Sequence, residues 1–129
     1  MGKYYEQLFD DGDFEISAEQ IAAASTAAEG ALPGLRRADD IESDYLDIAL
    51  AFLDYEPLYA EDGSLVEVAW SGYEPSWEGE KAVFAAIAPY VTAGSAIAFR
   101  EPHGDAYRYY FDGETMLKQS GSVAWEGAA

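Results

Sequence analysis

Short apolar runs and longer helical patterns divide the chain into strands and three helices. Residues 3–9, 55–59, 65–70, 95–100, 106–111 and 115–119 combine aromatic and apolar residues in short runs bounded by turn residues, which is typical of strands. Phe14 and Ile16 predict a further short strand, and a continuation of the last strand through 123–125 stays open. Helices are expected from residue 17 to about 29, from 40 or 43 to 53, and from 78 to 90.

The second of these helices has the most regular pattern. Its apolar stripe, with spacings of 4, 3 and 4 residues, consists of Ile41, Tyr45, Ile48 and Phe52, widened by Leu46, Leu50 and Leu53. Asp44, Asp47 and Asp54 fall on the opposite side. We therefore expect the stripe to face the core and the three aspartates to face solvent.

Turn and cap residues mark the ends of several elements. Ser17 and Gln20 match the spacing of a capping box, and Gly30 is suited to end the helix that follows. Asp-Gly pairs at 62–63 and 112–113 predict tight hairpin turns. Pro89 is expected to tighten or end the third helix.

The order of these elements predicts an α+β fold in a single domain over residues 1–129. Strands joined by short turns form antiparallel sheets, and amphipathic helices must bury their apolar side. We expect an antiparallel sheet of about five or six strands with three helices packed mainly on one face. Half of the residues are hydrophobic and 15% are aromatic, so a core of this kind is available.

The net charge says more about possible partners than any motif in the sequence does. The chain has 25 acidic and 7 basic residues and a net charge of −18. Residues 1–62 hold 16 of the acids and 3 of the bases. A field of this sign repels nucleic-acid phosphates and anionic membranes and attracts basic surfaces. Solubility and adaptation to high salt are the alternative explanations of the same charge.

The composition also excludes several kinds of site. The chain has no cysteine and one histidine, so thiol catalysis, disulfides, thiolate metal sites and paired-histidine sites are excluded. Segment 9–17 resembles part of a calcium loop, but neither register places the required glycine and glutamate, so a tight acidic turn is the better interpretation. No glycine-rich phosphate loop occurs. We expect no metal, no cofactor and no catalysis.

No apolar run approaches the length of a membrane span, and the N-terminus has no apolar signal region. The expected location is therefore the cytoplasm. His103 lies in a Pro-His-Gly-Asp turn, where a solvated histidine is the ordinary interpretation.

Aromatic residues gather in two places. On the penultimate strand, alternation places Tyr107, Tyr109 and Phe111 on one face, expected to be core, with Arg108 and Tyr110 on the other. Arg108 is expected to pair with a carboxylate or to stack on Tyr110. A second group surrounds one loop and consists of Trp70, Tyr73 and Trp77; it fits either the edge of the core or the anchors of a protein interface.

The tail of the chain resembles a recurrent segment in short acidic proteins of actinobacterial and phage-associated genomes. The residues that carry the resemblance are Ala88-Pro89-Tyr90-Val91, Gly94-Ser95, Ile97, Phe99-Arg100, Gly104, Tyr107-Arg108-Tyr109 and Phe111-Asp112-Gly113, together with the Asp62-Gly63 hairpin. The resemblance covers about a third of the chain and implies no known activity. The setting of such genes favours an interaction role over a metabolic one.

These features lead to the hypothesis of a non-catalytic interaction protein that binds and blocks a basic, nucleic-acid-handling partner, in the manner of an anti-CRISPR or anti-restriction DNA mimic. The expected binding residues are Asp10, Asp11, Asp13, Asp39, Asp40, Glu42, Asp44, Asp47, Asp54, Trp70, Tyr73 and Trp77. Two alternatives stay open. One is an acidic housekeeping domain with a small-molecule pocket or weak enzymatic activity, and the other is an immunity protein against a basic toxin nuclease.

Overall fold

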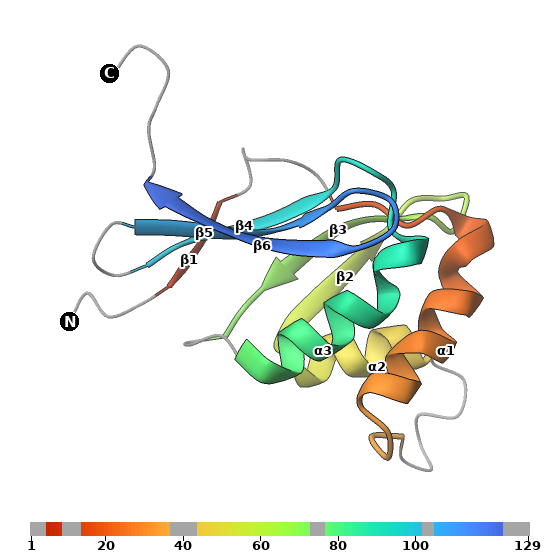
Figure 1. The fold of residues 1–129 in the computed structure, drawn as a ribbon. Coiled ribbons are helices and arrows are strands. Elements are labelled where there is room, and N and C mark those ends of the chain that lie inside the picture. Colours follow the sequence, from red (N-terminus) through yellow and green to blue (C-terminus); the bar gives the residue numbers. More distant parts are fainter. Residues whose placement is uncertain (1–4, 9–13, 37–43, 73–76, 102–104, 123–129) are drawn as a thin grey trace.

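The computed structural model describes residues 5–8, 14–36, 44–72, 77–101 and 105–122, and it confirms the α+β fold. The strands are β1 (Glu6–Leu8), β2 (Tyr55–Tyr59), β3 (Leu65–Trp70), β4 (Ala96–Arg100), β5 (Asp105–Phe111) and β6 (Met116–Ser122). The helices are α1 (Ile21–Ala31), α2 (Tyr45–Phe52) and α3 (Trp77–Ile87), with 3-10 turns η2 (Ala18–Gln20) and η4 (Ala88–Tyr90). The strands form a four-stranded antiparallel sheet, in the order β1-β4-β5-β6, and the β2–β3 hairpin (Figure 1).

The segment around β1 joins the two sheets. The side-chain amide of Gln7 donates to the carbonyl of Val68 over 2.9 Å and accepts from the backbone amide of Trp70 over 2.7 Å. It thus makes the two hydrogen bonds with β3 that a backbone peptide group of a neighbouring strand would make. Further along, Ile16 and Leu65 exchange two backbone hydrogen bonds of 2.9 and 3.0 Å. The hairpin thereby lies beside the edge of the larger sheet and adds to the same core.

The three helices gather on one side of the sheets, as the sequence predicts (Figure 1). The core between the layers is strongly aromatic. Phe84 of α3 lies at its centre, with ring centroids of Phe14, Tyr55, Tyr109 and Phe111 between 5.2 and 6.2 Å away. These rings meet at tilted or edge-to-face angles, the arrangement that the quadrupoles of aromatic rings favour.

The orientation of α2 differs from the one that its spacing predicts. Phe52 is 59% exposed, and Ile48 is only partly buried. The fully buried positions are Tyr45, Leu46, Ala49, Leu50 and Leu53. The helix is rolled toward its leucines because these, with the small Ala49, allow close approach to α1 and β2, and this roll leaves Phe52 on the surface.

The start of the first helix also differs from the prediction. Ser17 occupies the N-cap position of η2, but its side chain makes no capping hydrogen bond, and Gln20 donates its backbone amide to the Ser17 carbonyl over 2.9 Å. A 3-10 turn therefore replaces the predicted capping box. The helix also continues past Gly30 to Ala31, and the left-handed glycine after it is Gly34.

The remaining turn and core predictions are confirmed. Gly63 and Gly113 have positive φ angles of 91° and 98°, as tight hairpin turns require. Pro89 lies in the 3-10 turn that ends α3. The residues of β5 that the sequence places in the core, Tyr107, Tyr109 and Phe111, are all buried. Val83, Phe84 and Ile87 of α3 are buried beside them, as is Val91.

Candidate protein interface

The structure describes part of the acidic surface that the sequence predicts. Seven of the predicted binding residues lie outside the described residues: Asp10, Asp11, Asp13, Asp39, Asp40, Glu42 and Tyr73. Trp77 begins α3, and its side chain is not among those described. The histidine of the sequence, His103, also lies outside the described part. The structure therefore places four predicted residues, which are Asp44, Asp47, Asp54 and Trp70.

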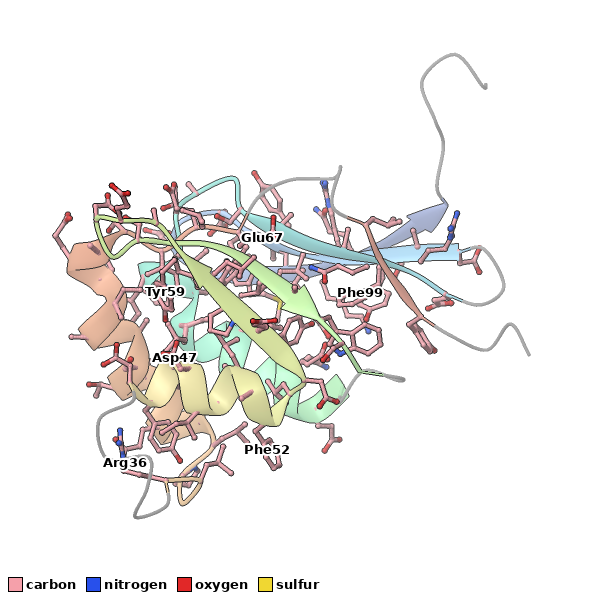
Figure 2. The ribbon with its side chains drawn as sticks, turned by 180° about the vertical axis from the view of Figure 1, so that it is seen from behind. Arg36, Asp47, Phe52, Tyr59, Glu67 and Phe99 are labelled. Carbon is pink, nitrogen blue, oxygen red and sulfur yellow. The ribbon has the colours of Figure 1, made fainter. Side chains whose placement is uncertain are left out.

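Asp44 and Asp47 form the acidic start of α2. Asp44 is the exposed N-cap, and its carbonyl accepts the amides of Asp47 at 3.0 Å and Ile48 at 3.3 Å. The Asp47 carboxylate turns toward the hairpin, where the hydroxyl of Tyr59 on β2 donates to it (Figure 2). This bond fixes Asp47 between helix and hairpin, while Asp44 stays in solvent.

The environment of Asp47 disfavours its charged form. Partial burial and the neighbouring charge of Asp44 raise the pKa of Asp47, against the hydrogen bond from Tyr59, which lowers it. Burial and the same carboxylate raise the pKa of Tyr59. The Asp47 carboxyl group is thus fixed in position, and a cation on a partner would stabilise its charged form.

We expect Asp47→Asn to raise the free energy of unfolding at pH 7 by less than about 0.5 kcal/mol, since the group is partly screened by solvent. A pKa that is raised in the folded state gives stability that is lost as the pH rises through that pKa, so the wild type should match the variant at low pH. Urea unfolding between pH 3 and pH 7 measures this. Asp44→Asn removes the same charge from an exposed position, and an identical pH dependence there would contradict a role for the environment of Asp47.

Asp54 and Trp70 lie at the open end of the hairpin, opposite its turn. Asp54 is exposed, has a φ angle of 69°, and accepts the Ser71 amide on its carbonyl over 2.8 Å. A Cβ added to Gly72 would stand 2.8 Å from both the Asp54 carboxylate and the Trp70 indole nitrogen, so only glycine fits here. Trp70 packs edge-to-face on Phe99 at 5.2 Å. Trp70 is therefore the edge of the core rather than a fully exposed anchor.

Exposed apolar side chains accompany the acids on this side of the molecule. Leu58, Tyr59 and Val66 of the hairpin are each 39 to 40% exposed, and Leu58 lies directly opposite Glu67. Figure 2 shows Tyr59 and Glu67 on the hairpin and Phe52 on α2 on the near side of the molecule. Apolar side chains rimmed by charges are typical of a protein interface. Leu58, Tyr59 and Val66 are not among the binding residues that the sequence predicts, because a short apolar run does not show which of its side chains are exposed.

Most described acids lie on the surface. The exposed ones are Glu15, Glu19, Glu29, Asp44, Asp54, Glu56, Glu61, Asp62, Glu78, Asp105, Asp112 and Glu114. Asp62 and Asp112 accept backbone amides within their own turns, and these hydrogen bonds lower the pKa of each carboxyl. Both turns therefore keep their negative charge to a lower pH than an ordinary aspartate would.

Glu80 is the exception, because it is fully buried in the first turn of α3. The Tyr109 hydroxyl donates to its carboxyl group over 2.9 Å. Burial and the charge of Glu80 raise the pKa values of Tyr55 and Tyr109 well above the usual tyrosine value. Among the described side chains, Glu80 is the buried acid. The cluster holds α3 against the sheets.

The predicted arrangement of the tail strands is confirmed. The guanidinium carbon of Arg108 lies 5.2 Å from the ring centroid of Tyr110, and its Nε donates to the Gln119 side chain over 2.6 Å. The Tyr107 ring stacks on the ring of Phe99, with their centroids 5.2 Å apart. The ammonium group of Lys118 lies over the Tyr107 ring, 5.0 Å from its centroid. The aromatic residues of this sheet are thus used in packing.

Fold and surface together define an acidic antiparallel α+β protein with a mixed acidic and apolar side on α2 and the hairpin. In the described part of the chain, no three histidine, cysteine or acidic residues are placed to hold a metal ion, and no helix has the length and apolar character needed to cross a membrane. No protein-family model, curated protein or solved structure matches the chain. The resemblance of the tail to short acidic actinobacterial and phage-associated proteins stays a prediction.

Proposed function

We propose that this is a non-catalytic interaction protein that binds a basic partner through the acidic side formed by α2 and the β2–β3 hairpin. The observation that carries the proposal is the exposure of this charge: seven basic residues are too few to neutralise 25 acidic ones, and most described acids are on the surface. Leu58, Tyr59 and Phe52 supply apolar contacts beside them. Acids would set the encounter rate and specificity, and the apolar residues would supply contact area.

The partner class that fits best is a nucleic-acid-handling protein. Its lysine and arginine groove normally accepts phosphates, which are spaced about 1.7 Å per charge along DNA. A surface with many carboxylates offers the same sign of charge and enters that groove in place of the nucleic acid. The resulting block is steric and electrostatic, as in anti-CRISPR or anti-restriction proteins that mimic DNA. An immunity protein against a basic nuclease would use the same electrostatics and differs only in its partner.

Capture from host lysate tests the proposal. At low salt the tagged protein should retain a basic nucleic-acid-binding protein, and double-stranded DNA or 0.5 M salt should release it, because counterions screen the contacts. The captured protein should lose its own DNA binding when this chain is added. Absence of any basic partner at low salt, or a complex that resists both salt and DNA, would overturn the proposal.

Charge reversal locates the surface. Asp44→Lys combined with Asp47→Lys should weaken binding to the captured partner on the order of a hundredfold, since each close charge pair is worth about 1.5 kcal/mol or more. Titration calorimetry measures the affinity. The matched control is Asp105→Lys with Glu114→Lys, which changes the net charge equally on exposed positions of β5 and its following turn. Equal weakening by both pairs would show that net charge alone, and not α2, carries the binding.

A further inference from the structure

The two outer strands of the sheets differ in how their edges are protected. An edge strand presents unpaired amide and carbonyl groups, and proteins usually block such edges with proline, charge or a bulge. On β2 all three are present: Pro57 lacks an amide hydrogen, Glu56 is an exposed charge, and the register shifts between Leu58 and Tyr59. This edge is closed to pairing with another strand.

The other edge, β6, carries one charged side chain, Lys118, but has neither a proline nor a bulge in the described residues. It is the last strand of the order β1-β4-β5-β6 and pairs with β5 in an unbroken register from Asp105 and Ser122 to Phe111 and Met116. Its sequence, MLKQSGS, contains no proline and no acid. Leu117, which is 46% exposed, lies in this strand. A regular seven-residue edge without acidic residues is suited to pair with a further strand.

Charge identifies the occupant of this edge. Two copies with a net charge of −18 repel each other over most of their surface. The repulsion is reduced at β6, whose own charged side chain is Lys118 and whose neighbour β5 holds Arg108 as well as Asp105. The basic partner proposed above favours the acidic α2 side instead. A copy of β6 is therefore the occupant that the charge pattern selects for this edge.

We infer that two copies of the protein join through β6, antiparallel and about a twofold axis near Gln119. This register places Lys118 opposite Ser120 of the second copy, so that no like charges face each other. A register centred on Lys118 would place the two ammonium groups opposite each other. The pairing extends the four-stranded sheet of each copy into one continuous sheet and closes the open edge, giving a closed twofold dimer.

Sedimentation velocity of the full chain, over a range of concentrations and at 0.05 and 0.5 M salt, tests the inference. The expected result is a dimer that becomes tighter at high salt, because screening weakens the repulsion between two acidic molecules. Binding of a basic partner has the opposite salt dependence, so the two proposals fail independently. A monomer at every concentration and salt overturns the dimer.

Variants of β6 separate this dimer from any other. Leu117→Glu with Gln119→Glu should weaken dimerisation on the order of tenfold or more, because the two carboxylates at position 119 then face each other across the twofold axis. Both positions are exposed, so the thermal unfolding transition should be nearly unchanged, which confirms folding. Leu58→Glu with Val66→Glu adds the same charge to exposed hairpin positions and should leave the dimer intact.

Cysteine cross-linking gives a positive result for the same edge. The chain has no cysteine, so a single Gln119→Cys substitution introduces the sole thiol. Under mild oxidation this variant should form a disulfide-linked dimer, whereas Ala51→Cys on the exposed side of α2 should stay monomeric. A dimer that persists in the glutamate variant and does not cross-link through Gln119→Cys uses another surface and overturns the inference.

Discussion

Replacing Glu80 by leucine should lower the free energy of unfolding by about 3 kcal/mol, although leucine is close in size and apolar. The reason is the group left behind: the Tyr109 hydroxyl, which donates to this carboxyl over 2.9 Å, would lose its acceptor inside the core. Removing one partner of a buried polar pair costs more than the pair contributes, since the remaining group stays desolvated and unbonded. Urea unfolding followed by circular dichroism measures the loss.

Two further variants give this prediction its control. Glu80→Gln keeps an oxygen that accepts from Tyr109, so it should cost about 1 kcal/mol. Adding Tyr109→Phe to Glu80→Leu removes the orphaned hydroxyl and should restore part of the loss, a coupling that a double-mutant cycle isolates. If Glu80→Leu is as stable as the wild type, the buried carboxyl does not hold α3 to the sheet.

The alternation of the tail strands predicts the fold well for a physical reason. Side chains on a strand alternate between faces, and the turns at Gly63 and Gly113 fix where each strand reverses. Tyr107, Tyr109 and Phe111 therefore have one self-consistent position, which is the core. Local pattern and turn chemistry agree here, and the structure follows them.

The site depends instead on contacts between segments that are distant in sequence. Glu80 lies at helical spacing from Val83, Phe84 and Ile87, so its inward position is readable, but its partner Tyr109 is on another element. The Asp47–Tyr59 contact likewise requires the hairpin to fold back beside α2.

The failed capping box at Ser17 has a similar cause. Ile16 forms an isolated β-bridge with Leu65, and the Glu15 carbonyl accepts a hydrogen bond from the Thr92 amide over 2.8 Å. These tertiary hydrogen bonds fix the approach to the helix and override the local capping preference.

Phe84→Ala should lower the free energy of unfolding by about 4 kcal/mol, more than Glu80→Leu does. Phe84 is fully buried at the centre of the aromatic cluster, and alanine would leave a cavity that Phe14, Tyr55, Tyr109 and Phe111 cannot fill without giving up their own contacts. Because domains of this size are stable by roughly 5–15 kcal/mol, the variant should unfold at a much lower urea concentration.

Phe52→Ala is the matched control, with the same truncation on a side chain that is 59% exposed. It should change the free energy of unfolding by less than about 0.5 kcal/mol, as is usual for surface positions. The pair also tests the roll of α2, because the spacing of Ile41, Tyr45, Ile48 and Phe52 predicts Phe52 in the core. A loss from Phe52→Ala comparable to that from Phe84→Ala would mean that the spacing is right and that the leucines do not face inward. A small loss of stability together with a reduced affinity for the partner would instead place Phe52 in the binding surface, as an exposed aromatic residue on the same helix as Asp47.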